Sequence, residues 1–331
     1  MVIFRIQDSL RSIMTSFQHE FPFDPTCGYD RTALLAVQPP AGPDDFDAFW
    51  RETWMENEAT PLDLHIRELE SPTPDYTLHA LRYSTLHGVK VGAWLMTPVG
   101  GSFDTAAVVG HGYGGRDAPD VPNKHAAFLF FCAPGFHLSS DPELPNDCYK
   151  HVLHGIAHRD TYIIRTCVAA VWSSARVLET YFERSFTDMK YFGDSFGGGL
   201  GALAMPFDSR FTHCVMSVPT FGHQPIRLNC RGQGSGEAVR LYAQEHPEVI
   251  DVLQYYDAGT AATRITIPNV TAPALFDPSV APPGQFAVSN PMARYGHQYV
   301  LSAGHFQYAE GDREHQELSR LVDRVMWGAS V

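Results

Sequence analysis

The chain has 331 residues, which is enough for one large α/β domain with insertions or for two ordinary domains. Its net charge of −13 gives it no attraction to nucleic acid or to an anionic membrane surface, so we expect neither as a partner. The sequence contains no run of about 18 apolar residues, which argues against a helix that spans a bilayer.

The N-terminal residues and the cysteines favour a cytoplasmic protein. Arg5, Asp8 and Arg11 interrupt the apolar residues at the start, where a secretory signal would be continuously apolar. The six cysteines are scattered without a C-x-x-C pair, which is typical of reduced thiols. A mature secreted form whose signal has been removed is the alternative.

The first hundred residues predict an arm, one helix and a group of strands. Residues 1–43 have weak periodicity and a proline-rich end, which favours an extended N-terminal arm before a domain at 44–331. Apolar residues at helical spacing after Asp45 predict a helix that Pro61 ends. Strand-like runs follow, and we expect them to pair antiparallel, at residues 64–69, 76–84 and 89–97.

From residue 106 onward, predicted strands alternate with predicted helices. Such alternation is typical of an α/β protein whose mostly parallel central sheet is covered by helices on both faces. The strands are expected at 106–109, 127–132, 189–192, 213–218, 269–273 and 299–302, and the helices at 160–182, 283–292 and around Leu318 to Val325. Residues 219–265 interrupt the pattern with two predicted helices, at 237–246 and 248–257, so we expect a helical lid insertion there.

The stretch Gly193-Asp194-Ser195-Phe196-Gly197 lies between an apolar strand and a small-residue helix. The order strand, G-x-S-x-G, helix is the context of a nucleophile elbow, in which glycines let the backbone turn sharply around the serine. Ser195 is therefore the candidate nucleophile. The alternative is a tight Gly/Ser turn without chemistry.

A serine hydroxyl needs a base, and the base needs an orienting group. In such sheets the partners follow in the order Ser, Asp or Glu, His, at strand ends. Asp277 and His305 meet both conditions, so we expect Asp277 to orient His305 and His305 to take the Ser195 proton. Asp277 precedes a proline and could simply begin a turn, and His305 is one of 16 histidines.

Acyl transfer also requires donors for the oxyanion. The elbow offers the backbone N–H of Phe196, and the loop at 111–115, after the strand at 106–109, offers the N–H of Tyr113. That loop could instead be a plain glycine turn. We expect no metal, because the histidines at 151, 154 and 158 share a helical face without acidic or cysteine partners. We also expect no cofactor, because the glycine-rich stretch at 231–236 follows no strand and lacks the acidic residue of a dinucleotide site.

From about residue 44 to its end, the chain resembles the acetyl xylan esterase / cephalosporin C deacetylase family, carbohydrate esterase family 7 of the α/β-hydrolase superfamily. The matching pieces include 46–50, 61–63, 92–95, 112–115, 161–162, 193–200, 218–219, 256–257, 267–268, 282–283 and the residues Asp277 and His305. The resemblance implies an α/β-hydrolase fold and the triad Ser195, Asp277 and His305, with the N–H groups of Tyr113 and Phe196 as oxyanion hole. It also implies removal of acetyl groups from xylo-oligosaccharides and small esters, and a homo-oligomer, commonly a hexamer.

The chain departs from the family pattern around the site, as a divergent member would. Phe196 replaces the usual glutamine after the serine, and Phe306 replaces the glutamate after the histidine. The residues at 133–136 replace an Arg-Gly-Gln motif. We expect Tyr113, Phe196 and Phe306 to line an apolar substrate pocket.

These features favour a serine carboxylic-ester hydrolase acting through an acyl-enzyme on a small ester with a short acyl group. Two alternatives stay open at this stage. The same triad would serve an acyltransferase that passes the acyl group to an alcohol or amine, and a silent binding protein could retain the fold without the chemistry.

Overall fold

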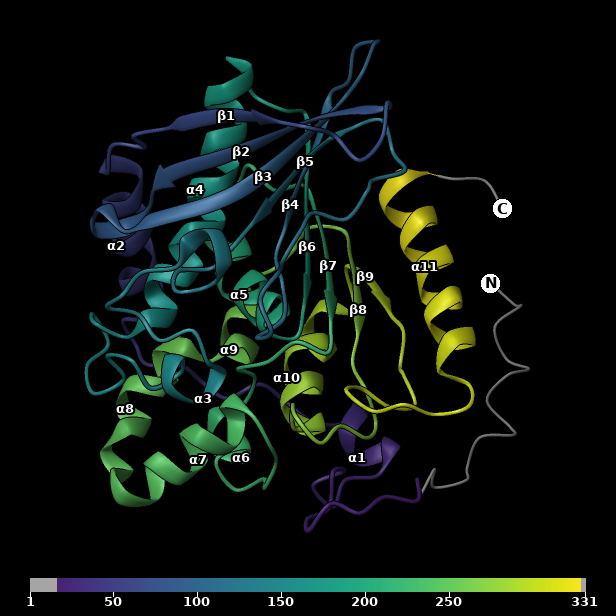
Figure 1. Ribbon diagram of the computed structural model, residues 1–331. Coiled ribbons are helices and arrows are strands. Elements are labelled where there is room, and N and C mark those ends of the chain that lie inside the picture. The colour runs from purple at the N-terminus through teal and green to yellow at the C-terminus, as the bar shows by residue number, and fades with distance from the viewer. Residues whose placement is uncertain (1–16, 329–331) are drawn as a thin grey trace.

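A nine-stranded sheet runs through residues 17–328, the part of the chain that the computed structural model describes (Figure 1). Its order is β1-β2-β3-β5-β4-β6-β7-β8-β9. The strands at the β1 end, β1 (His65–Leu69), β2 (Tyr76–Ser84) and β3 (Lys90–Pro98), pair antiparallel, as predicted. The others are β4 (Thr105–Val109), β5 (Ala127–Phe131), β6 (Asp188–Asp194), β7 (His213–Ser217), β8 (Asn269–Ala272) and β9 (Gly296–Gln298). From β5 to β9 all neighbouring strands are parallel, so the sheet is mixed and mostly parallel.

Helices cover both faces of this sheet (Figure 1). One face carries a continuous layer in which each helix contacts the next, formed by α2 (Phe46–Ala59), α4 (Ile163–Phe182), α5 (Phe196–Ala204), α9 (Ala258–Ala262) and α10 (Pro282–Met292). The other face carries α11 (Gly311–Trp327), which contacts β7 and β8. The predicted α/β-hydrolase fold class is therefore confirmed.

The alternation of side chains along β6 divides the core between the two faces. Tyr191 points into the large core under α4 and α5 and is fully buried. Phe192 points the opposite way and stacks on Trp327 of α11, with ring centroids 6.2 Å apart. This two-sided burial is what a parallel strand under helices requires.

The segment between β7 and β8 contains α6 (Gln224–Arg227), α7 (Ser235–Glu245) and α8 (Ile250–Leu253). The helix predicted at 248–257 is instead a series of short helical segments that includes α8. Asp257 then caps the next helix, α9, because its carboxylate accepts the N–H of Thr260. α7 contacts α3 (Cys148–His151) at the lower left of Figure 1.

The N-terminal residues lie along α10 rather than apart from the domain. Residues 17–43 contain one short helix, α1 (Arg31–Leu35), which contacts α10. Asn290 of α10 donates to the carbonyls of Leu34 and Val37, at 3.0 and 2.9 Å. The predicted arm is thus partly helical.

The predicted strand at 299–302 is wrong. The ninth strand is β9, three residues earlier, and in the predicted range Leu301 makes an isolated bridge to Ala274. Pro273, which directly follows β8, has no N–H to donate, so the hydrogen-bond ladder between the two segments is interrupted at this point. His305 therefore lies further from its strand than the pattern indicated.

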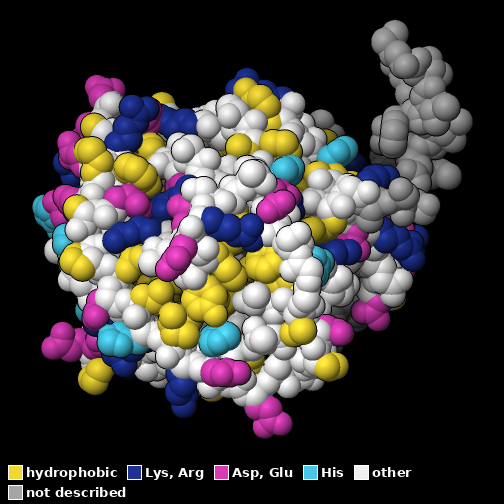
Figure 2. Space-filling view, turned by 90° about the horizontal axis from the view of Figure 1, so that it is seen from above, with side chains coloured by type: hydrophobic (Ala, Val, Ile, Leu, Met, Phe, Trp, Pro, Cys, Tyr) yellow, Lys and Arg dark blue, Asp and Glu magenta, His cyan; other side chains and the backbone are white. Residues whose placement is uncertain are grey.

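The surface seen from above carries charges of both signs. Basic and acidic side chains are interspersed there around a group of apolar ones (Figure 2). Within residues 17–328, every helix is too short or too polar to cross a bilayer.

Candidate active site

The backbone turns sharply at Ser195, between the end of β6 and the start of α5. Ser195 has φ 52° and ψ −109°, in a region that a residue with a Cβ rarely adopts. The strand and the helix can approach each other at this turn because Gly193 and Gly197 lack side chains. A Cβ on Gly193 would lie 2.5 Å from the carbonyl group of Gly197. The serine hydroxyl is thus presented at the carboxyl end of the central strand.

The three residues predicted as a triad form one hydrogen-bonded series. The Nε2 atom of His305 lies 3.1 Å from the Ser195 hydroxyl oxygen. On the other side of the ring, Nδ1 lies 2.8 and 3.1 Å from the two carboxylate oxygens of Asp277. A carboxylate can only accept, so Nδ1 carries the proton and Nε2 is free to accept from the serine.

The electrostatic surroundings favour a positive charge on His305. Burial alone would favour the neutral ring, but the hydrogen bond to Asp277 and the negative charges of Asp277 and Asp194 raise the pKa of His305 above its ordinary value of 6.5. The site therefore stabilises the imidazolium that forms when the ring takes a proton.

Asp277 is held by a set of donors that the sequence did not predict. Its side chain is fully buried, and one oxygen accepts the N–H groups of Ser279 and Val280 at 2.8 and 3.0 Å. The other oxygen accepts from the side-chain amide of Gln285, at 2.9 Å. The only local signal was the Asp-Pro-Ser turn, because Gln285 reaches the acid from the first turn of α10.

The loop at 111–115 lies against the elbow. The Gly197 N–H donates to the His111 carbonyl at 2.9 Å, and a Cβ on Gly112 would lie 3.9 Å from the Ser195 Cβ. Among the described residues, the N–H groups of Phe196 and Tyr113 donate to no protein acceptor. The first donor belongs to the residue after Ser195 and the second to the residue after Gly112, and both are free to bind another group.

His111 fixes this loop from behind, a role that sequence reasoning missed. Its Nδ1 donates to the Gly112 carbonyl at 2.7 Å, and its Nε2 accepts the Ala133 N–H at 2.9 Å. Burial lowers the pKa of His111 to about 4, so the ring is neutral, as an accepting Nε2 requires.

Comparisons with known proteins identify the family of the chain. The family model described as acetyl xylan esterase (AXE1) matches residues 38–318. The chain belongs to the acetyl xylan esterase family.

Individual relatives of this family member are distant. The acetyl esterase Axe7A of Xylanibacter ruminicola is 24% identical over 244 residues, which are 68% of this chain and 55% of that protein. The chain thus spans about half the length of that relative. An acetyl xylan esterase from Paenibacillus has a TM-score of 0.76 at 21% identity, over 90% of this chain and all of the other. An acetyl xylan esterase from Thermoanaerobacterium has a TM-score of 0.74 at 18% identity, over 88% of this chain and 99% of the other. These two likenesses show the fold.

The side chains expected to form the pocket do not all meet. Tyr113 and Phe196 stack with ring centroids 4.0 Å apart. Phe196 is fully buried and packs on Phe136, from the segment that replaces the Arg-Gly-Gln motif of the family pattern. Phe306 lies apart from them, and its ring contacts in the described residues are with Phe17, Phe21 and Phe276.

The histidines considered as metal ligands have other surroundings. His151 is buried, and its Nε2 donates to the Pro134 carbonyl at 2.9 Å. Its Nδ1 lies 3.3 Å from the Tyr113 hydroxyl, which donates to it. Within residues 17–328, no three His, Cys, Asp or Glu side chains are grouped as metal ligands.

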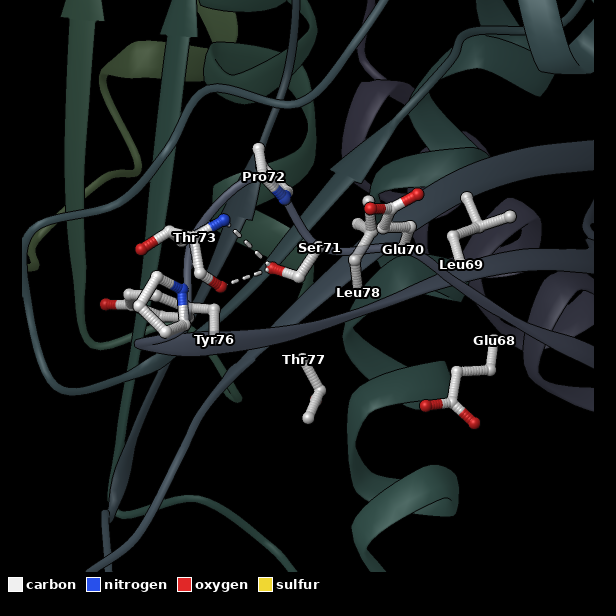
Figure 3. A pocket seen from close by; sticks show the side chains of 10 residues that line it. Glu68, Leu69, Glu70, Ser71, Pro72, Thr73, Tyr76, Thr77 and Leu78 are labelled. Carbon is white, nitrogen blue, oxygen red and sulfur yellow. Dashed lines mark hydrogen bonds between the residues drawn. The ribbon is translucent and has the colours of Figure 1, made fainter.

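Two hollows lie away from these residues. The one in Figure 3 lies at the turn between β1 and β2, where Ser71 bonds to Thr73. The other lies between α2 and the start of α4, beside Arg159 and Arg165. Neither is lined by Ser195, Asp277 or His305.

Proposed function

We propose that this protein is a serine carboxylic-ester hydrolase that removes acetyl or other short acyl groups from small or carbohydrate esters. Membership of the acetyl xylan esterase family supports an esterase. The observation that carries the reaction type is the hydrogen-bonded series from Ser195 through His305 to Asp277.

In the first half of the reaction, His305 Nε2 accepts the hydroxyl proton while the Ser195 oxygen attacks the ester carbonyl. The carbonyl oxygen becomes negative in the tetrahedral intermediate, and the N–H groups of Phe196 and Tyr113 stabilise it. The imidazolium then gives its proton to the departing alcohol, which leaves an acetyl group on Ser195.

In the second half, water replaces the alcohol. His305 takes a proton from the water, whose oxygen attacks the acyl carbon, and returns the proton to Ser195 as acetate departs. Asp277 keeps its charge throughout, holds the ring in one tautomer and stabilises its positive form.

The test is hydrolysis of p-nitrophenyl acetate by the wild-type protein and by Ser195→Ala. Loss of the nucleophile is expected to lower kcat by a factor on the order of 10⁶. If Ser195→Ala hydrolyses the ester at a rate similar to that of the wild type, the proposal is refuted. Failure of a fluorophosphonate probe to label Ser195 in folded protein would favour a silent binding protein instead.

The acceptor of the acyl group is decided by the products. Hydrolysis predicts acetate as the product even when a competing alcohol is present. If the acyl group appears mainly on the alcohol, the protein is an acyltransferase that uses the same three residues.

A further inference from the structure

The His305 loop has a backbone conformation that needs support from outside. His305 has φ 46°, in the left-handed region that a residue with a Cβ rarely adopts. On one side the loop is fixed by Glu314 of α11, which accepts from Ser302 and from the Tyr308 hydroxyl. The other side depends on packing.

The packing on that side is an aromatic cluster built around Phe306, the residue after His305. Its ring lies 5.0 Å from Phe276, which directly precedes Asp277 and is almost fully buried. Phe17 lies 5.5 Å from Phe306 and 5.1 Å from Phe276, so it contacts both rings. Phe21 lies 6.1 Å from Phe306.

The same N-terminal stretch is fixed to the acid loop through its backbone. The carbonyl of Pro25 accepts the N–H of Asp277 itself, at 3.1 Å. The carbonyl of Pro22 accepts from Arg231, in the segment between β7 and β8, at 3.1 Å. This purple stretch lies at the lower edge of the molecule in Figure 1.

From these contacts we infer that residues 17–28, the N-terminal strap, hold the loops of His305 and Asp277 in the register that lets His305 reach Ser195. Phe17 is the main positioning residue, because its ring contacts the neighbours of both side chains. It touches neither the substrate nor the reacting atoms and acts through Phe306 and Phe276.

The strap matters for rate because the His305 to Ser195 hydrogen bond depends on the backbone position of one loop. A displacement of about 1 Å between reacting groups can cost on the order of 10²-fold in rate. Without the Phe17 ring, Phe306 loses one of its packing partners, and the loop gains freedom to move away from the serine.

Phe17→Ala tests the inference, and Phe103→Ala is its matched control. Both phenylalanines are half-buried and each contacts three other rings. Phe103 lies before β4, at the opposite end of the strands from Ser195. With p-nitrophenyl acetate we expect kcat of Phe17→Ala to fall about 10- to 100-fold with KM little changed, and that of Phe103→Ala to stay near wild type.

The kinetic readout rests on the proposed function, so a second readout is independent of it. Nuclear magnetic resonance titration of the His305 ring reports its pairing with Asp277 in any folded protein. We expect the pKa of His305 to move down towards 6.5 in Phe17→Ala and to stay at the wild-type value in Phe103→Ala. If the wild-type protein hydrolyses no ester, the proposed function fails, and the titration of the His305 ring still tests whether the strap positions the loop.

A conservative variant separates positioning from folding. Phe17→Leu keeps an apolar side chain at the cluster and is expected to recover most of kcat. If Phe17→Ala does not fold, Phe21→Ala takes its place and removes a more peripheral ring of the cluster. We then expect a smaller fall in kcat and a smaller decrease in the pKa of His305. Wild-type kcat and wild-type His305 titration in the folded variant, or equal losses in the Phe103→Ala control, would overturn the inference.

Discussion

The side-chain amide of Gln285 donates to Asp277 at 2.9 Å and at the same time to the carbonyl of Val280 at 2.7 Å. Its oxygen accepts the N–H of Ala274 at 2.8 Å. One fully buried side chain therefore joins the end of β8, the acid loop and the first turn of α10. The orientation of the acid depends on this amide as much as on the acid's own turn.

Gln285→Leu is expected to lower both stability and activity. Leucine cannot bond to Val280 or Ala274, and each buried group left without a partner costs about 1–3 kcal/mol of unfolding free energy. With one fewer donor to hold Asp277, kcat should fall about 10- to 100-fold. Urea unfolding and ester kinetics measure the two effects. Gln298→Leu, which removes bonds to Ser289 and Asn290, is the control and should leave kcat near wild type.

Asp277→Asn is expected to lower kcat by a factor on the order of 10⁴, because an amide can donate to Nδ1 and so favour the wrong tautomer. The residual activity should have its acid limb at lower pH than in the wild type, because the charge that raises the pKa of His305 is gone. An acid limb unchanged by the substitution would show that Asp277 does not set the titration of the ring.

The pH dependence of the wild type follows from the raised pKa of His305. Activity requires the neutral ring, so kcat/KM should fall as the pH drops through a midpoint above 6.5. The contribution of His305 to the free energy of unfolding changes with pH in the opposite direction. The contribution of the protonated ring is fully present below pH 6.5 and is lost as the pH rises through the folded-state pKa. Rate profiles and unfolding curves over pH 5–9 check both, with His305→Gln as the control.

Gly193→Ala is expected to open the elbow. A Cβ there would lie 2.5 Å from the backbone of Gly197, which cannot move away without displacing the start of α5. We expect a lower melting temperature and a loss of kcat of about 10²-fold, because the nucleophile itself is displaced. Gly236→Ala is the control, because a Cβ there would lie 3.5 Å from the Ser279 carbonyl oxygen, an ordinary contact distance. This variant should retain the wild-type melting temperature and rate. Equal behaviour of the two variants would contradict the proposed crowding.

Phe196→Ala is expected to affect stability more than chemistry. The ring is fully buried among Tyr113, Phe136 and Phe221, so its removal should cost about 3–5 kcal/mol of unfolding free energy. The proposed oxyanion donor is the backbone N–H, which alanine keeps. Below the melting temperature, kcat should therefore stay within about tenfold of wild type, a smaller loss than that of a missing oxyanion donor. Chemical denaturation and kinetics on the same sample measure both.

Much of the fold and the three central residues could be predicted from the sequence, because their signals are local. The elbow has a glycine pattern next to Ser195, and Asp277 and His305 each follow an apolar run, although His305 lies further from β9 than its run indicated. The last strand was misplaced because Pro273 interrupts a ladder in a neighbouring segment, which periodicity does not reveal. Gln285 and Phe17 were missed for a related reason. Their roles come from contacts with residues that are remote in sequence or on another element.

The strap brings the beginning of the described chain against a loop near its end, and this has a consequence for biogenesis. The residues around Phe17 are synthesised long before Phe306 and cannot dock until the segment that contains Phe306 has been made. Contacts of such long sequence separation form slowly and late. A nascent or truncated polypeptide that stops before Phe306 would therefore lack these contacts, and its proposed reaction centre would be incomplete.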